Sequence, residues 1–347
     1  MTDYPFTPAT LTAGLRRYLD APGLKLLSTS DLPRPAVFPG IQGEQAGWFT
    51  LRPFSAQIQM QQVDYWLAFT LKQGDIACEH EIHHYEKLLY MPILIPNFVA
   101  ADSKQGWIVL ETIDDLRPAD QWTIDDYREA VDNLALLHDR FWGLSEDLDN
   151  FTKLAQPLAR DYEKLCTSGQ QSGEKLLRDA PLPDLITPRY KAALENLIQH
   201  LEEIAAPLKT QPFTLLHGDY WADNIARPLD GRQMVTHWQF AAIAPAIIDV
   251  IMFHQQTRSH LTPSLPLEAA IARYRAKLDE CLGKPAYKEE EWALLWDHAL
   301  LWVFAVRWLK RLAELPAEKY DHPQFSQHWL EPVVSALERR LRVPLPA

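Results

Sequence analysis

The stretch HGDYWADN at residues 217–224 decides how the rest of this 347-residue sequence is interpreted. In it, His217, Gly218 and Asp219 are followed, after four intervening residues, by Asn224. A chance match to this pattern is expected in fewer than roughly one random chain in a thousand of this composition, so we treat it as a motif. The competing interpretation is a capped turn that exposes an aspartate and an asparagine to solvent.

The motif resembles the catalytic loop of the aminoglycoside phosphotransferase and choline kinase-like family. In kinase-like enzymes an aspartate on this loop accepts the proton of the substrate hydroxyl, and an asparagine on the same loop holds a metal ion. The resemblance therefore implies that Asp219 is the catalytic base and that Asn224 is a catalytic metal ligand. It also implies transfer of the γ-phosphate of ATP or GTP to a hydroxyl group of a small molecule, with Mg²⁺ or Mn²⁺ as the ion.

The next segment, MVTHWQF at residues 234–240, matches the family except at its metal ligand. The family places a second metal-binding aspartate in a segment like I-D-W-Q, and here His237 stands in that position. Mg²⁺ prefers oxygen ligands, whereas imidazole suits transition-metal ions. Since a bound metal contributes several kcal/mol to phosphoryl transfer, we expect a loss of roughly a thousandfold in rate. His237 is then a degenerate metal position that serves as a packing residue, as a ligand for another ion, or as a substitution introduced to trap a bound state. The downstream Asp249 matches a further family aspartate with a structural role.

Upstream, two segments resemble the family's phosphate-binding elements. FTLKQG places Lys72 at the end of a predicted strand, and EHEIHHYEKL resembles the E-x-x-x-Y helix through Glu81. The resemblance implies that Lys72 binds nucleotide phosphate and that Glu81 orients it, with Glu79 as an alternative partner. The competing interpretation is a surface lysine and a solvated glutamate. RPFSAQIQ lacks glycine, but the backbone N–H of Ser55 is a candidate phosphate donor.

The architecture predicted from these segments is α+β and bilobal, as in protein kinases. Up to about Leu110 the sequence predicts a small antiparallel β-sheet with one helix, and beyond it the composition becomes helical. VLETI resembles the family's hinge, where backbone groups from Glu111 to Ile113 meet the purine edge. We therefore expect an N-lobe at residues 1–113 that binds nucleotide phosphate, and a helical C-lobe at 114–347 with the catalytic loop and the acceptor site.

A zinc protease is a remote alternative. HEIHH fits H-E-x-x-H, in which His80 and His84 would bind zinc and Glu81 would act as general base. A chance match to that pattern is expected in roughly one chain in forty, and no third ligand is recognisable downstream. A second alternative is a catalytically weak or inactive pseudokinase that binds a nucleotide or metabolite.

Composition limits the partners and the compartment. A net charge of -12 without a Lys/Arg run argues against nucleic acid. The three cysteines are far apart and fit neither a disulfide framework nor a zinc site, and no signal peptide is recognisable. The apolar run from Trp292 is broken by Asp297, His298 and Arg307, which favours a buried helix over a membrane span. We therefore expect a cytoplasmic protein that acts on a nucleotide and a small-molecule acceptor; neither the acceptor nor the oligomeric state can be read from the sequence.

Overall fold

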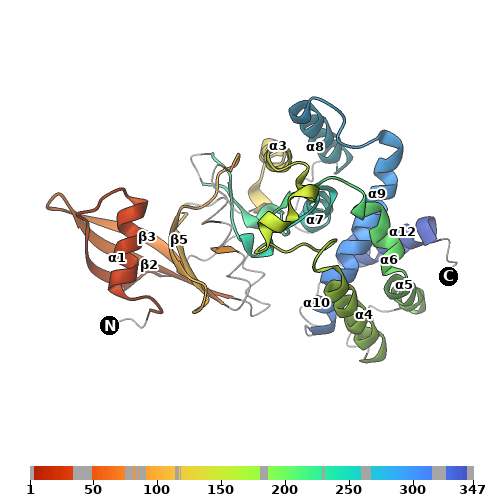
Figure 1. Ribbon diagram of the computed structural model, residues 1–347, viewed down its shortest axis with the longest axis horizontal. Coiled ribbons are helices and arrows are strands. Elements are labelled where there is room, and N and C mark those ends of the chain that lie inside the picture. Colours follow the sequence, from red (N-terminus) through yellow and green to blue (C-terminus); the bar gives the residue numbers. More distant parts are fainter. Residues whose placement is uncertain are drawn as a thin grey trace. The chain divides into compact units, whose positions relative to one another are not determined.

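The computed structural model describes residues 4–33, 49–74, 81–82, 85, 91–113, 117, 119–179, 187–228, 231–258, 267–314 and 326–341. The chain forms two compact units (Figure 1). Unit 1 comprises Met1–Gln121 and Asp223–Ala241, and unit 2 comprises Trp122–Ala222 and Ala242–Ala347. Unit 1 is therefore discontinuous in sequence, which the expected boundary between residues 113 and 114 does not capture.

Unit 1 is built on a five-stranded antiparallel sheet in the order β1-β2-β3-β5-β4. The strands are β1 (Lys25–Asp31), β2 (Phe49–Met60), β3 (Val63–Gly74), β4 (Phe98–Asp102) and β5 (Trp107–Glu111). β-branched and aromatic residues recur along β2 and β3 and favour strands, and the two strands meet at a tight turn at Gln61 and Gln62, which both have positive φ. The antiparallel sheet predicted for this region is confirmed.

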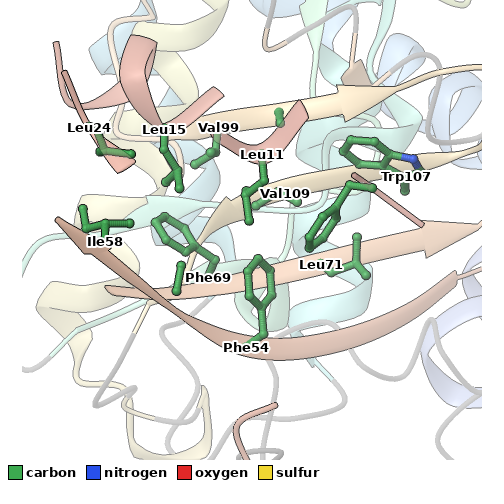
Figure 2. Close-up of a cluster of buried hydrophobic side chains, with 13 residues drawn as sticks. Leu11, Leu15, Leu24, Phe54, Ile58, Phe69, Leu71, Val99, Trp107 and Val109 are labelled. Atoms are coloured by element: carbon green, nitrogen blue, oxygen red, sulfur yellow. The ribbon is translucent and has the colours of Figure 1, made fainter. Parts of the chain in front are cut away.

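A helix at the N-terminus, α1 (Pro8–Tyr18), covers one face of this sheet. Proline near the first position and a Thr7 side chain that accepts the Thr10 N–H start the helix. Leu11 and Leu15 enter an apolar core with side chains from β2, β3, β4 and β5 (Figure 2). Gly14 allows the close approach, because a Cβ there would lie 2.5 Å from the carbonyl oxygen of Val99. The sequence predicts a single helix in this region, so α1 is an additional element. Of the helix expected after β3, only Glu81, Ile82 and Tyr85 are described, and all three are helical.

Unit 1 also contains a short hairpin from the second half of the chain. Strands β7 (Ile225–Ala226) and β8 (Met234–Val235) pair antiparallel, and the 3-10 turn η6 (Trp238–Phe240) follows. The N–H of Val235 donates to the carbonyl of Leu94 at 2.9 Å, which joins the hairpin to the N-terminal part of the unit.

Unit 2 is mainly helical, with one short two-stranded sheet of β6 (Phe213–Leu216) and β9 (Ala242–Pro245). A capping box starts α3: the sequence T-x-x-D from Thr123 to Asp126 is the local signature of this interaction, and the two residues exchange hydrogen bonds. Its helices are α3 (Ile124–Arg140), α4 (Tyr162–Asp179), α5 (Pro188–Gln199), α6 (Leu201–Lys209), α7 (Ile247–Arg258), α8 (Leu267–Leu282), α9 (Glu289–Val303), α10 (Leu309–Glu314) and α12 (Glu331–Leu341).

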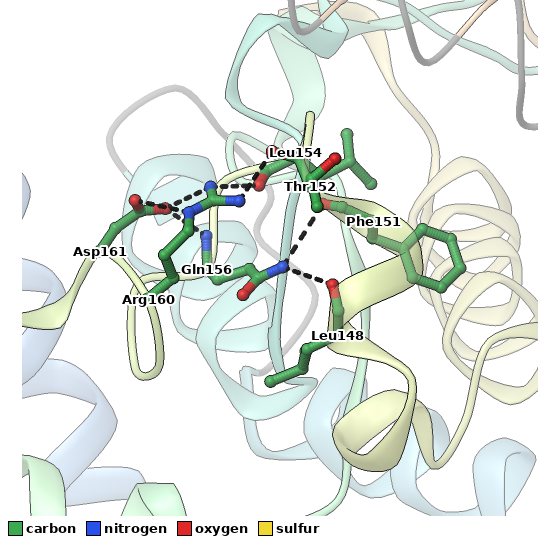
Figure 3. A network of polar contacts seen from close by, with 7 residues as sticks. All are labelled: Leu148, Phe151, Thr152, Leu154, Gln156, Arg160 and Asp161. Atoms are coloured by element: carbon green, nitrogen blue, oxygen red, sulfur yellow. Dashed lines mark hydrogen bonds and ion pairs between the residues drawn. The ribbon is translucent and has the colours of Figure 1, made fainter.

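The connection between α3 and α4 is held by polar contacts (Figure 3). Arg160 donates to the carbonyls of Thr152 and Leu154, at 2.7 and 2.8 Å, and pairs with Asp161. Asp161 also accepts the N–H of Gln156 at 2.7 Å. These contacts order a segment whose Ala155 carbonyl accepts the N–H of Ile243 in β9.

The apolar run from Trp292 forms the buried helix α9, as the sequence predicts. A π-helical turn, η7 (Phe304–Trp308), joins it directly to α10. None of the helices in the described part of the chain combines the length and apolarity needed to span a bilayer.

Candidate active site

The loop that begins at His217 follows β6 in unit 2 and is fixed by Asp249 at the start of α7. The Asp249 carboxylate is fully buried and accepts the N–H groups of His217 at 2.7 Å and Gly218 at 2.8 Å. Gly218 has a φ of 77, a left-handed conformation that glycine adopts without strain. Asp249 therefore shapes the loop, in agreement with the structural role expected for it.

A buried network lies behind Asp249. His138 of α3 places its Nε2 3.5 Å from the Asp249 carboxylate, and its Nδ1 lies 2.7 Å from the hydroxyl of Tyr274. Burial, together with the neighbouring Tyr287 and Asp249, raises the pKa of Tyr274 well above its usual value. Tyr274 therefore keeps its proton, and its hydroxyl shares a hydrogen bond with Nδ1 of His138.

Asp219, the expected base, is bound by an arginine that the sequence analysis did not assign. Arg307, from the π-helical turn η7, places Nη2 2.5 Å from Oδ1 of Asp219. Its Nη1 donates to the carbonyl of Gly218. Both charged side chains are largely buried. A lone arginine inside an apolar helical run needs a buried acceptor, and that was the available signal for this contact.

In unit 1, Lys72 and Glu81 form a buried ion pair. Lys72 Nζ lies 2.5 Å from Glu81 Oε2, and the two side chains are 2% and 0% exposed. Lys72 also donates to Oε1 of Gln239 at 2.7 Å, and Glu81 accepts the N–H of Trp238 at 3.2 Å. The expected contact between Lys72 and Glu81 is present, and the interpretation as a surface lysine with a solvated glutamate is wrong. The rival Glu79 lies outside the described residues.

His237 and Asn224 lie at the same end of the β7–β8 hairpin. The carbonyl of Asn224 accepts both the N–H and the hydroxyl of Thr236, at 2.9 and 3.0 Å, and His237 follows Thr236 directly. His237 has a left-handed backbone, with φ 64 and ψ 55. Its ring stacks on Phe49, with 5.6 Å between ring centroids, and Lys72 also lies against the Phe49 ring, with Nζ 4.3 Å from the centroid.

This donor set fits Mg²⁺ poorly. The two expected ligands supply one amide and one imidazole and no carboxylate, and the imidazole is packed against an aromatic ring. Within the described ranges, no cluster of three or more His, Cys, Asp or Glu side chains is arranged to hold a metal ion.

The remaining nucleotide-binding candidates are located in the sheet. Ser55 lies in the middle of β2, paired with Ser30 on one side and Ala68 on the other, so its backbone groups serve the sheet. Ser55 therefore lies within a paired strand, and the N–H that was expected to bind phosphate is part of the sheet. At the expected hinge, Glu111 donates its N–H to the carbonyl of Asn97, at 3.0 Å. Ile113, the other end of that hinge, has no hydrogen bond within the described part of the chain.

The zinc-protease motif is not supported by the position of its central residue. His80 and His84 lie outside the described residues. Glu81 is fully buried and holds Lys72 and the Trp238 N–H, so its carboxylate is not placed to activate a water molecule.

Comparison with solved structures shows the fold. A choline kinase from Cryptosporidium parvum Iowa II aligns with a TM-score of 0.56 and 12% identity over 95% of this chain and 98% of that chain. Plasmodium vivax ethanolamine kinase gives a TM-score of 0.54 and 14% identity over 94% and 85%. A thermostable mutant of the aminoglycoside phosphotransferase APH(4)-Ia, in a ternary complex with ADP and hygromycin B, gives 0.50 and 10% over 94% and 98%. The predicted kinase-like α+β fold is confirmed.

Sequence comparison identifies the family. Among curated protein sequences, none matches this chain. A family model described as "Phosphotransferase enzyme family" matches residues 70–289, a range that includes Lys72, the HGD loop and Asp249. Because this match spans more than half of the sequence, the chain belongs to the phosphotransferase enzyme family.

Proposed function

We propose that the protein transfers the γ-phosphate of a nucleoside triphosphate to a hydroxyl group of a small molecule. The observation that carries the proposal is the buried Lys72–Glu81 ion pair, because this pair must be formed for phosphates to be held in kinase-like enzymes. The ADP and hygromycin B in the APH(4)-Ia complex support a nucleotide and a hydroxyl-bearing acceptor as the two ligand classes.

In this proposal each unit contributes separate functions. In unit 1, Lys72 binds nucleotide phosphate, and backbone groups from Glu111 to Ile113 meet the purine edge. In unit 2, Asp219 accepts the proton of the acceptor hydroxyl, and the loop anchored by Asp249 fixes its direction.

The metal position is where this chain departs from its family. Asn224 and His237 are the residues that would face a metal ion, but imidazole brings no charge to offset triphosphate. We therefore propose that His237 lowers the turnover of this chain.

A second candidate function is a nucleotide-binding protein with little or no turnover. It is favoured by the stacking of His237 on Phe49, which commits the ring to packing. The two functions differ in their dependence on Asp219, because an enzyme loses turnover when the base is removed, whereas a binding protein keeps its nucleotide affinity.

The test is calorimetric titration of ATP and GTP, with Mg²⁺ or Mn²⁺, into the unmutated chain and into His237→Asp, followed by measurement of nucleotide turnover. Asp and Asn both tolerate the left-handed backbone at position 237, so His237→Asn is a matched control that supplies an oxygen without the charge. We expect His237→Asp to raise Mg²⁺-dependent turnover by about tenfold or more, with a smaller gain for His237→Asn. Asp219→Asn should lower the turnover to a small residual rate in each background.

The alternatives give different results. Nucleotide binding that is unaffected by Asp219→Asn, without turnover in any variant, would identify the binding protein. If neither the unmutated chain nor His237→Asp binds a nucleotide, the phosphotransfer proposal is wrong.

A further inference from the structure

The π-helical turn η7 (Phe304–Trp308) carries an arginine into the interior of unit 2. It interrupts an otherwise continuous helix from Glu289 to Glu314. A π-turn inserts one extra residue into a helix with 3.6 residues per turn, so it rotates the side chains that follow by about 100°. Arg307 is the charged residue of this turn, and Phe304, Ala305 and Trp308 around it are buried.

The π-helical turn η7 packs closely against α4. Gly169 of α4 lies against the backbone of Ala305, where a Cβ would come within 2.9 Å of the carbonyl oxygen. On another side, the ring of Trp308 packs on that of Trp329 with 4.9 Å between centroids. These contacts fix the backbone from which Arg307 extends, so the direction of its guanidinium group is determined by packing.

The guanidinium contacts both residues that form the turn of the HGD loop. It pairs with the Asp219 carboxylate at 2.5 Å and donates to the carbonyl of Gly218. The N–H of Gly218 is held by the buried Asp249 carboxylate and its carbonyl by Arg307, so the residue is fixed on both sides. Arg307 is 18% exposed and Asp219 is 13% exposed, so water competes weakly with this charge-assisted contact.

We propose that Arg307 is a positioning residue for phosphotransfer. It holds the Asp219 carboxylate in the orientation in which it meets the acceptor hydroxyl, and it transmits the position of the α9–α10 helix to the loop. The inference rests on the function proposed above, and it adds a residue that lies 88 positions downstream of Asp219 in the sequence.

The test compares Arg307→Ala and Arg307→Lys with Arg311→Ala. Arg311 is one turn further along, in α10, and stacks on Trp308 at 5.2 Å, so its removal controls for the loss of an arginine from the same helix. The probe is ADP release from ATP with Mg²⁺ or Mn²⁺, measured in the unmutated and the His237→Asp backgrounds. We expect Arg307→Ala to lower kcat by about 10–100-fold with the KM for ATP nearly unchanged. Arg307→Lys, or guanidinium ion added to Arg307→Ala at a non-denaturing concentration, should restore part of the rate.

A double-mutant cycle separates positioning from general destabilisation. If Arg307 acts through Asp219, Arg307→Ala should change the residual rate of Asp219→Asn by less than about twofold. The inference would be overturned if Arg307→Ala lowered the rate of Asp219→Asn as much as it lowers the rate of the unmutated chain. It would also be overturned if Arg307→Ala lowered kcat no more than Arg311→Ala does.

Hydrogen exchange distinguishes failure of the inference from failure of the proposed function. Arg307→Ala should increase exchange of the amides of residues 215–222, and Arg311→Ala should not. If the chain shows no turnover in either background, the phosphotransfer proposal fails. In that case, unchanged exchange of residues 215–222 in Arg307→Ala overturns the inference about Arg307 as well. Increased exchange supports the contact between Arg307 and the loop on which the inference rests.

Discussion

Replacing Asp249 with asparagine should destabilise unit 2, because the carboxylate of Asp249 is fully buried and accepts two backbone N–H groups, from His217 and Gly218. An asparagine of the same shape accepts one N–H through its carbonyl oxygen and presents its own NH₂ group to the other. One buried N–H then loses its acceptor, which costs about 1–3 kcal/mol, and the remaining bond loses its charge, which costs about 1 kcal/mol more. We expect a total loss of about 2–4 kcal/mol in the free energy of unfolding.

The assay is urea unfolding followed by circular dichroism, together with hydrogen exchange of residues 213–222. Asp102→Asn is the exposed control, since Oδ1 of Asp102 accepts two backbone N–H groups in an exposed turn, from Lys104 at 2.9 Å and Gln105 at 3.1 Å. Its loss should stay below about 1 kcal/mol, because the asparagine carbonyl oxygen can accept both N–H groups and water solvates the rest. A loss for Asp249→Asn no larger than for Asp102→Asn would refute the reasoning, because Asp249 is buried and uses both of its carboxylate oxygens.

Two further substitutions test contacts within unit 2. Gly169→Ala should lower Tm, because a Cβ 2.9 Å from a backbone oxygen costs about 1–3 kcal/mol, which exceeds the gain in helix propensity. Gly23→Ala is the control, because a Cβ there would have no atom within 4 Å. An unchanged Tm for Gly169→Ala would contradict the close packing against Ala305. Burial alone would raise the pKa of Asp161, but hydrogen bonds from Arg160 and the Gln156 N–H lower it below the usual 3.8. The stability contributed by Asp161 is therefore present above pH 3.8 and lost as the pH falls through the lowered pKa. Asp161→Asn should cost about 1–2 kcal/mol at pH 7 and progressively less below pH 3.8, and a cost independent of pH would exclude this origin.

The sequence predicted best where local pattern and chemistry agree. Thr123 and Asp126 were recognisable as a capping box because that interaction is local. Lys72 and Glu81 could be paired because a buried charge requires a partner and the family motif supplies one nearby. Asp249 was expected in a structural role because it matches a family aspartate, and its carboxylate holds the HGD loop.

The sequence failed where contacts depend on register or on distant packing. The backbone N–H of Ser55 was expected to bind phosphate, but Ser55 lies inside the 12-residue strand β2, and the pairing of a strand with two neighbours is not encoded locally. Arg307 was noted only as an interruption of an apolar run. Its contact with Asp219 depends on a π-helical turn and on the packing of that turn against Gly169, and neither feature has a local sequence signal.

The discontinuity of unit 1 has a consequence for biosynthesis. Glu81 and Lys72 emerge from the ribosome early, but Trp238 and Gln239, which hold their side chains, are made more than 150 residues later. The nascent N-terminal sheet therefore carries two buried charges without their final partners while about a hundred residues of unit 2 are synthesised. During that interval unit 1 resembles an unfinished domain, and a chain truncated before residue 241 would leave it permanently incomplete.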